Sequence, residues 1–312
     1  MTNNLLEATN IHKKYGSHVA LNNLSINIPK GCIYGLLGPN GAGKTSFIRI
    51  LNQITYPDAG TVLFDGEELQ PKHIANIGYL PEERGLYKSM KVGEQALYLA
   101  QLKGLSKAEA KEKLTYWFDK LEIGDWWNMK IQELSKGMAQ KIQFVVTVLH
   151  TPKLLIFDEP FSGFDPINAN LIKDEILKLK ENGATVIFST HRMESVEELC
   201  DEIALINKSN KILDGKLIDV KRQFRSNTYE IALDVKDKGA VYNEIMNSHF
   251  KMHEADFRTL GEELKFSIQI DADSSPNELL SFLMNRGTVA HFKELIPSVN
   301  DIFIKAVNNH NI

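Results

Sequence analysis

The strongest constraint on the fold is a glycine-rich segment that lies between an apolar run and a helical pattern. The apolar run is Ile33–Leu37, and the helical pattern covers residues 47–52. The segment between them reads Gly38, Pro39, Asn40, Gly41, Ala42, Gly43, Lys44, Thr45 and Ser46. Glycines are needed where backbone N–H groups curl inward around concentrated negative charge, and the following helix adds the positive end of its dipole. The pattern G-x-x-x-x-G-K-[ST] in this context predicts a loop that holds a triphosphate.

Two side chains of this loop are suited to a nucleotide. Lys44 is expected to reach the β- and γ-phosphates, and the Thr45 hydroxyl is expected to ligate magnesium. The same pattern can arise in an ordinary glycine-rich turn, but the strand before it and the helix after it favour phosphate binding. A nucleoside triphosphate with Mg²⁺ is therefore the predicted ligand.

A second motif places two carboxylates at the end of another apolar strand. Residues 154–157 are apolar, and Asp158, Glu159 and Pro160 follow directly. Ligands bind beyond the carboxyl ends of strands in sheets of this kind. Asp158 is expected to hold magnesium, directly or through water, and Glu159 to act as general base for the attacking water. Alone, the motif could equally be a buried strand that ends in an acidic turn.

Composition limits the class of protein and its partners. The 312 residues are 43% hydrophobic and 24% charged, which is typical of a globular protein of about two domains. The formal net charge of -4 provides no broad basic field, so nucleic acid is not a favoured partner. Cys32 and Cys200 lie far apart without metal-ligand spacing, and we expect buried or incidental thiols.

The membrane and export signals that can be read from a sequence are not found here. No apolar run approaches the ~20 residues of a membrane-spanning helix. The first ten residues lack the basic region, apolar stretch and cleavage site of a secretory signal. We therefore expect a cytoplasmic protein.

The chain divides into two predicted domains. Residues 1–220 alternate short β-branched runs with helical patterns, which indicates an α/β domain with a largely parallel sheet. Residues 227–312 follow a polar and basic boundary. Their expected elements are a strand at 228–235, a helix at 239–248, strands around Phe257 and at 264–270, a helix opened by Ser275 with Glu278 completing a capping box, a strand at 288–295 and a helix from Ser298. This order predicts a small α+β domain, which we interpret as ferredoxin-like.

A third motif links residues 5–219 to a known family. Leu134-Ser135-Lys136-Gly137-Met138, 23 residues before Asp158, resembles the signature loop of the ATP-binding cassette (ABC) ATPases. The resemblance implies a P-loop fold with a parallel core sheet, an antiparallel β subdomain and a helical insert at about residues 91–150. In the family this loop opens a helix and clamps the γ-phosphate held by the other subunit of a dimer.

The signature loop departs from the usual family pattern at two positions. Lys136 replaces a glycine and Met138 replaces a glutamine. Ser135 and Gly137 keep the family residues and are expected to contact the partner's nucleotide. Standing alone, the motif would more simply be a serine helix cap followed by a loop lysine.

Four further positions match the family residue by residue. Tyr15 resembles the aromatic that stacks on adenine. Asp165 resembles the aspartate loop that links the two sites of the dimer, and His191 resembles the histidine that senses the γ-phosphate. Glu82 stands where the family usually has a glutamine, and its carboxylate can ligate magnesium. Three of them have a plainer interpretation: Tyr15 as a surface aromatic, Asp165 as a turn residue and His191 as a structural histidine.

The resemblance implies a function and partners. Two copies are expected to sandwich two ATP molecules with Mg²⁺, with closure driving a separate integral-membrane permease, most similar to bacterial exporters including those for sodium. The chain would then lie on the inner face of the cell membrane. The alternative is a soluble ABC ATPase that acts on ribosomes or DNA. The accessory domain is expected to be structural, regulatory or a dimerisation element.

An aromatic group in the helical insert has two interpretations. Its members are Tyr116, Trp117, Trp126 and Trp127. Either they are core residues, which is the commoner role of large aromatic side chains, or they form a surface that receives a permease helix. We favour the core.

Overall fold

The computed structural model describes residues 3–82, 85–259, 261–271 and 273–309. The chain forms two compact units, Met1–Ile218 with Phe303–Ile312, and Asp219–Ile302. Cys32 and Cys200 are free and buried, as predicted. None of the helices in the described ranges is long and apolar enough to cross a membrane.

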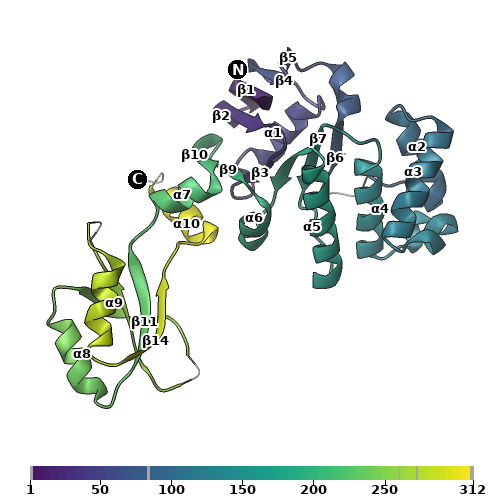
Figure 1. Cartoon of the computed structure of the whole chain (residues 1–312). Coiled ribbons are helices and arrows are strands. Elements are labelled where there is room, and N and C mark those ends of the chain that lie inside the picture. Colours follow the sequence, from purple (N-terminus) through teal and green to yellow (C-terminus); the bar gives the residue numbers. More distant parts are fainter. Residues whose placement is uncertain (1–2, 83–84, 260, 272, 310–312) are drawn as a thin grey trace. The chain divides into compact units, whose positions relative to one another are not determined.

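The first unit is built around a six-stranded sheet in the order β10-β9-β3-β8-β7-β6 (Figure 1). Its strands are β3 (Ile33–Leu37), β6 (Ile77–Leu80), β7 (Leu154–Asp158), β8 (Thr185–Ser189), β9 (Glu202–Asn207) and β10 (Asn210–Lys216). All neighbouring pairs are parallel except β9 with β10. Every residue of β3, β7 and β8 is buried, which is why these segments are continuous apolar runs.

A second sheet is antiparallel and has the order β2-β1-β4-β5. Its strands are β1 (Asn4–Tyr15), β2 (His18–Pro29), β4 (Ala59–Phe64) and β5 (Glu67–Glu68). Helix α1 (Lys44–Leu51) contributes Phe47, Ile48 and Leu51 to one apolar cluster with side chains of both sheets. This packing fixes the start of α1, where the glycine-rich loop ends.

The helical insert consists of three helices and two 3-10 turns. They are α2 (Val92–Leu102), α3 (Lys107–Lys120), η2 (Gly124–Asn128), η3 (Ile131–Glu133) and α4 (Lys136–Val148), and α2 packs on both α3 and α4. The predicted capping box is present: the Ser106 hydroxyl accepts from Glu109 N at 3.2 Å, and Glu109 Oε2 accepts from Ser106 N at 2.9 Å. The other helices of this unit are α5 (Pro166–Glu181) and α6 (Met193–Leu199), with η1 at Pro71–Asn76.

The aromatic group of the insert is mostly packed. Trp117 is 8% exposed and meets Phe144 edge-on, with ring centroids 5.8 Å apart. Trp127 lies against Gly93, where an added Cβ would overlap its indole ring. Tyr116 is exposed. The core interpretation therefore holds for Trp117 and Trp127.

The second unit is a four-stranded antiparallel sheet with two helices on it. The chain runs β11 (Thr228–Asp234), α8 (Lys238–Met246), β12 (Lys251–Glu254), β13 (Leu264–Gln269), α9 (Pro276–Met284) and β14 (Thr288–Glu294). Helix α7 (Leu217–Gln223) precedes it and α10 (Val299–Asn309) follows it. The strand order β12-β13-β11-β14 is that of the ferredoxin-like βαββαβ arrangement, as predicted.

Two local predictions in this unit were wrong. The strand expected around Phe257 lies earlier, at Lys251–Glu254, where the chain pairs with β13. Phe257 itself packs on the His291 ring, with the ring centroids 5.0 Å apart. The predicted capping box at Ser275 and Glu278 is also wrong: the Ser275 hydroxyl caps α9 by accepting from Asn277 N at 3.2 Å, and Glu278 N donates to the Ser275 carbonyl oxygen.

The packing of the insert on the central sheet gives a stability prediction. Phe144 is fully buried, stacked on Phe157 of β7 and in contact with Trp117. We expect Phe144→Ala to lower the free energy of unfolding of the first unit by about 3–5 kcal/mol, because it removes a large side chain and leaves a cavity. Ile167→Ala, at a side chain that is 83% exposed, should change it by less than about 0.5 kcal/mol. Urea denaturation would compare them, and equal midpoints would contradict the prediction.

Candidate nucleotide-binding site

The glycine-rich loop is held tightly between the two sheets. Gly38, Gly41 and Gly43 all have positive φ, at 149°, 79° and 117°. A Cβ on Gly38 would overlap the carbonyl oxygen of Ile206 in β9, and one on Gly43 would overlap that of Ala20 in β2. The conformation therefore requires glycine. The first-turn N–H groups of α1, beyond this loop, have no partner within the helix and are available to an anion.

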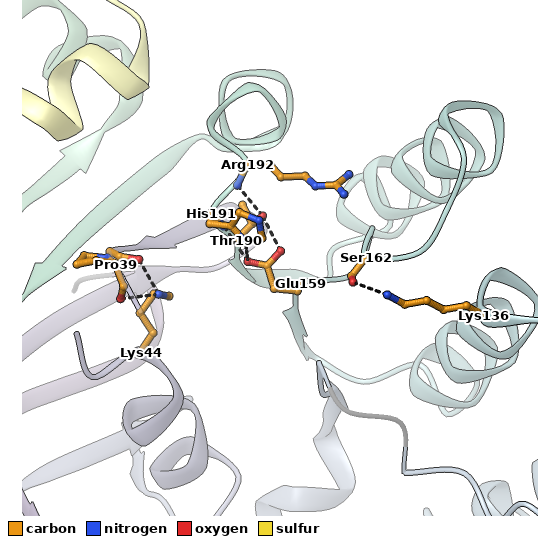
Figure 2. A network of polar contacts seen from close by, with 9 residues as sticks. Pro39, Lys44, Lys136, Glu159, Ser162, Thr190, His191 and Arg192 are labelled. Carbon is orange, nitrogen blue, oxygen red and sulfur yellow. Dashed lines mark hydrogen bonds and ion pairs between the residues drawn. The ribbon is translucent and has the colours of Figure 1, made fainter. Parts of the chain in front are cut away.

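The side chain of Lys44 folds back onto this loop. Its Nζ donates to the carbonyl oxygens of Gly38, at 2.6 Å, and Pro39, at 3.1 Å (Figure 2). Burial lowers the pKa of Lys44, and the nearby carboxylates of Asp158, Glu159 and Glu82 oppose that shift. The predicted phosphate-binding lysine thus lies close enough to the three carboxylates expected to act on the nucleotide and its metal for their charges to affect its pKa.

Asp158 ends β7 and is buried. Burial raises the pKa of Asp158, and the carboxylates of Glu82 and Glu159 act in the same direction. A group of three or more His, Cys, Asp or Glu side chains suited to a metal is not found within the described ranges. Magnesium at a triphosphate needs only one or two carboxylates, because phosphate oxygens and water complete its octahedron. The oxygens of Asp158, Glu82 and Thr45 fit that hard cation.

Glu159 directly follows β7, and three polar contacts from the residues after β8 hold its carboxylate. Its Oε1 accepts from His191 N at 2.8 Å and lies 2.7 Å from His191 Nδ1. Its Oε2 accepts from the Thr190 hydroxyl at 3.1 Å. The Thr190 oxygen in turn accepts from Arg192 N at 3.0 Å (Figure 2). These contacts fix the carboxylate of the predicted general base beside the predicted sensing histidine.

The backbone of Glu159 is in the left-handed region, with φ at 51°. A non-glycine residue in that region is strained, and such residues concentrate where function requires a fixed geometry. Glu159 N donates to Ser189 O at 2.9 Å, so β7 and β8 together impose the turn.

The signature loop and the aspartate loop act as helix caps within the single chain. The Ser135 hydroxyl accepts from Met138 N at 3.2 Å and caps α4, which begins at Lys136. Asp165 caps α5 and accepts from Asn168 N at 3.0 Å; this backbone bond, with one from the Asn168 side chain, lowers the pKa of Asp165. Gly137 lies beside the loop of Gly163 and Phe164, since a Cβ on it would lie 3.5 Å from Gly163 O and 3.7 Å from Phe164 Cδ1.

Tyr15 lies at the end of β1 with 43% of its side chain exposed. Lys13 Nζ is 5.4 Å from the centroid of its ring. The ring is thus free to stack on a planar ligand, which is the property expected of the adenine-binding position.

Sequence reasoning missed the contacts around this site. The Thr190 bond to Glu159 spans 31 residues, and a bond from Lys136 Nζ to the Ser162 hydroxyl spans 26. Neither pair has a spacing rule that a single sequence could reveal. The Ser-Thr-His run after β8 was the available signal for Thr190.

These features define a P-loop ATPase, and two comparisons give its family. The profile described as ABC transporter matches residues 21–162. The profile described as ATP-binding protein DrrA1-3-like, C-terminal domain, matches residues 215–307. The chain belongs to the ABC transporter ATP-binding proteins and is an ABC-type ATPase.

Full-length relatives share both units. An uncharacterised ABC transporter ATP-binding protein of Bacillus subtilis, YhaQ, is 39% identical over 97% of this chain and 98% of its own length. The Nod factor export ATP-binding protein I of Cupriavidus metallidurans is 30% identical over 96% of each chain.

A solved structure also matches the fold. It is an ATP binding subunit of an ABC transporter, 30% identical to this chain with a TM-score of 0.66, and the match covers 70% of this chain and 93% of that one. The predicted ABC family and P-loop fold are therefore confirmed.

The Glu159 contacts give a prediction for Thr190. We expect Thr190→Val to lower ATP turnover about 10-fold or more, because a buried carboxylate loses a hydrogen bond of about 1.5–3 kcal/mol. Thr190→Ser keeps the hydroxyl and should retain turnover within about threefold. Steady-state phosphate release by the purified chain would compare the two variants. If valine and serine were equally active, the bond would have no part in holding Glu159.

Proposed function

We propose that this chain is the ATP-hydrolysing subunit of an exporter, which works as a pair of identical chains on a separate integral-membrane permease. The observation with most weight is the fixed carboxylate of Glu159, held by Thr190 and His191 on the side of the sheet where Lys44 and Asp158 also lie. The chemistry below is assigned residue by residue on that basis.

Nucleotide binding is assigned to the loop and its neighbours. Residues 38–46 surround the phosphates with backbone N–H groups, and Lys44 leaves the Gly38 and Pro39 carbonyls to meet the β- and γ-phosphates. Tyr15 stacks on adenine. Thr45, Asp158 and Glu82 hold Mg²⁺, which when bound neutralises charge on the phosphates.

Hydrolysis is assigned to Glu159 and His191. The Glu159 carboxylate accepts a proton from the attacking water, and His191 keeps the carboxylate and the γ-phosphate in register. Positioned groups supply most of the rate in phosphoryl transfer. The strained backbone of Glu159 keeps its carboxylate in a fixed position for this reaction.

The place of the signature loop supports a second copy in this proposal, because Lys136 of that loop and Lys44 of the phosphate loop lie at opposite sides of the view in Figure 2. Ser135 and Gly137 stand at the N-terminus of α4, which suits an anion offered by another molecule. Closure of two copies places each signature loop on the other's γ-phosphate, and Asp165 links the two sites. This arrangement makes turnover depend on dimerisation.

A groove beside Glu82 suits the permease. Its volume is about 670 Å³, and Tyr79 and Pro81, just before Glu82, lie along it. Most of the lining is apolar, including Ile54, Ile74, Leu86, Leu99, Leu102 and Val146. An apolar groove of this kind accepts the apolar face of a helix. The groove is our candidate for the permease contact, in place of the surface alternative for the aromatic group of the insert. Its position next to Glu82 would connect the nucleotide state to the membrane partner.

The direction of transport in this proposal is supported by a relative, and the location is inferred from the role. A relative that matches both units is named for Nod factor export, which favours export for this chain. An ATPase subunit that drives a permease lies in the cytoplasm, at the inner face of the cell membrane, and we assign that location to this chain. The competing function, a soluble ABC ATPase on ribosomes or DNA, is disfavoured by the net charge of -4.

The proposal predicts a separation of binding from hydrolysis. We expect Glu159→Gln to bind ATP with Mg²⁺ and to accumulate as a dimer, while turnover falls at least ~100-fold because the amide cannot accept the proton. Size-exclusion chromatography with light scattering, with and without ATP, would measure the dimer, and phosphate release would measure turnover.

The matched control is Glu181→Gln, which makes the same change at an exposed residue in the last turn of α5. It should keep normal turnover and form no lasting dimer. Near-normal hydrolysis by Glu159→Gln would overturn the assignment of the general base.

A further inference from the structure

The first turns of α4 and the loop after Glu159 are joined at two points. Lys136 Nζ donates to the Ser162 hydroxyl at 3.3 Å (Figure 2), and Gln140 Nε2 donates to the Pro160 carbonyl oxygen at 3.1 Å. Gln140 is buried. The loop itself is closed by Ser162 N, which donates to Glu159 O at 3.1 Å. A continuous set of contacts therefore runs from the start of α4 to the backbone of the general base.

Lys136 is an unusual residue for the first position of a helix. A cation there faces the positive end of the helix dipole, so the charge is unfavourable unless it has a compensating contact. In the part of the chain that the structure describes, its recorded polar contact is the uncharged Ser162 hydroxyl. The stability of α4 therefore does not explain why the positively charged Lys136 stands at its first position.

The loop after Glu159 is shaped to receive this lysine. Gly163 has φ at 94°, and a Cβ on it would lie 2.5–2.7 Å from the Cγ, Cδ and Cε atoms of Lys136. The aliphatic part of Lys136 thus lies directly over the glycine. Gly137 approaches the same loop, since a Cβ on it would lie 3.5 Å from Gly163 O.

We propose that Lys136 is a positioning residue that ties the signature loop to the loop of residues 160–163, so that engagement of one nucleotide is transmitted to Glu159 of the other site. The signature loop touches the partner's nucleotide, whereas Glu159 serves the chain's own. When α4 moves onto the partner's γ-phosphate, Lys136 carries Ser162 and the Glu159 turn with it. This inference rests on the proposed function, because it requires the two-chain ATP sandwich.

The competing role for the Lys136 amine is direct binding of the partner's γ-phosphate. The two roles differ in whether Ser162 matters. A tether needs both partners, so loss of either one should have the same effect and loss of both should add nothing. A phosphate ligand needs only the amine, and its loss would weaken nucleotide binding.

The test is a double-mutant cycle on the full-length chain with Lys136→Met, Ser162→Ala and the pair. Methionine keeps the aliphatic stem over Gly163. Initial rates of phosphate release across ATP concentrations give kcat, the half-saturating ATP concentration and the Hill coefficient. The control is Lys107→Met, because Lys107 is likewise the first residue of a serine-capped helix, α3.

The tether predicts that Lys136→Met and Ser162→Ala each lower kcat about 3- to 10-fold and bring the Hill coefficient toward one. The half-saturating ATP concentration should stay within about twofold, the pair should be no worse than either single variant, and Lys107→Met should match the unmodified chain. Lys136→Arg, which keeps the charge and most of the reach, should restore part of the cooperativity.

Three results would overturn the tether. The first is a normal Ser162→Ala beside a Lys136→Met that needs several-fold more ATP, which would make the amine a phosphate ligand. The second is a pair of variants whose separate effects on kcat multiply in the double variant. The third is unchanged kinetics in the tether variants while Glu159→Gln forms a normal dimer with ATP, which would refute only the tether. If Glu159→Gln formed no dimer with ATP, the sandwich itself would fail.

Discussion

The close approach of the glycine-rich loop to strands of both sheets determines where the rest of the site can be. Gly38 lies against the Ile206 carbonyl of β9 and Gly43 against the Ala20 carbonyl of β2, at distances that leave no room for a side chain. Helix α1 then packs its apolar face between the same sheets. Because the loop cannot shift without breaking these contacts, its N–H groups and the backbone of Lys44 have a fixed position relative to the ends of β7 and β8. A rigid scaffold of this kind suits a reaction in which positioning supplies most of the catalysis.

The carboxylates at the end of β7 differ in what holds them. Asp158 is buried, and that burial raises its pKa, which favours a cation nearby. Glu159 is fixed by contacts from Thr190 and His191 and by a strained backbone. Adjacent acidic residues on one strand thus have environments suited to different tasks, metal binding and proton transfer. The second copy and the permease would then act on a site whose interior is already arranged.

Much of the fold could be predicted from sequence because it depends on local patterns. The buried strands β3, β7 and β8 are continuous apolar runs, and the Ser106–Glu109 capping box formed as expected. The strand placed around Phe257 was wrong because an aromatic residue in a loop can pack on a ring, here that of His291, without entering the sheet. The contacts of Thr190 and Lys136 could not be predicted, since they join loops that only the tertiary fold brings together. Lys136 was visible only as a departure from the family pattern.

Co-purification from native membranes would show whether this ATPase works on a separate membrane permease. The tagged chain would be isolated from gently solubilised native membranes in magnesium and ATP, and the proteins that accompany it identified by mass spectrometry. A multi-span membrane protein should accompany the chain in stoichiometric amount. Leu102→Glu, which places a charge in the groove, should release that protein while ATP binding persists. Recovery only from the soluble fraction, alone or with ribosomal or DNA-bound proteins, would contradict the claim.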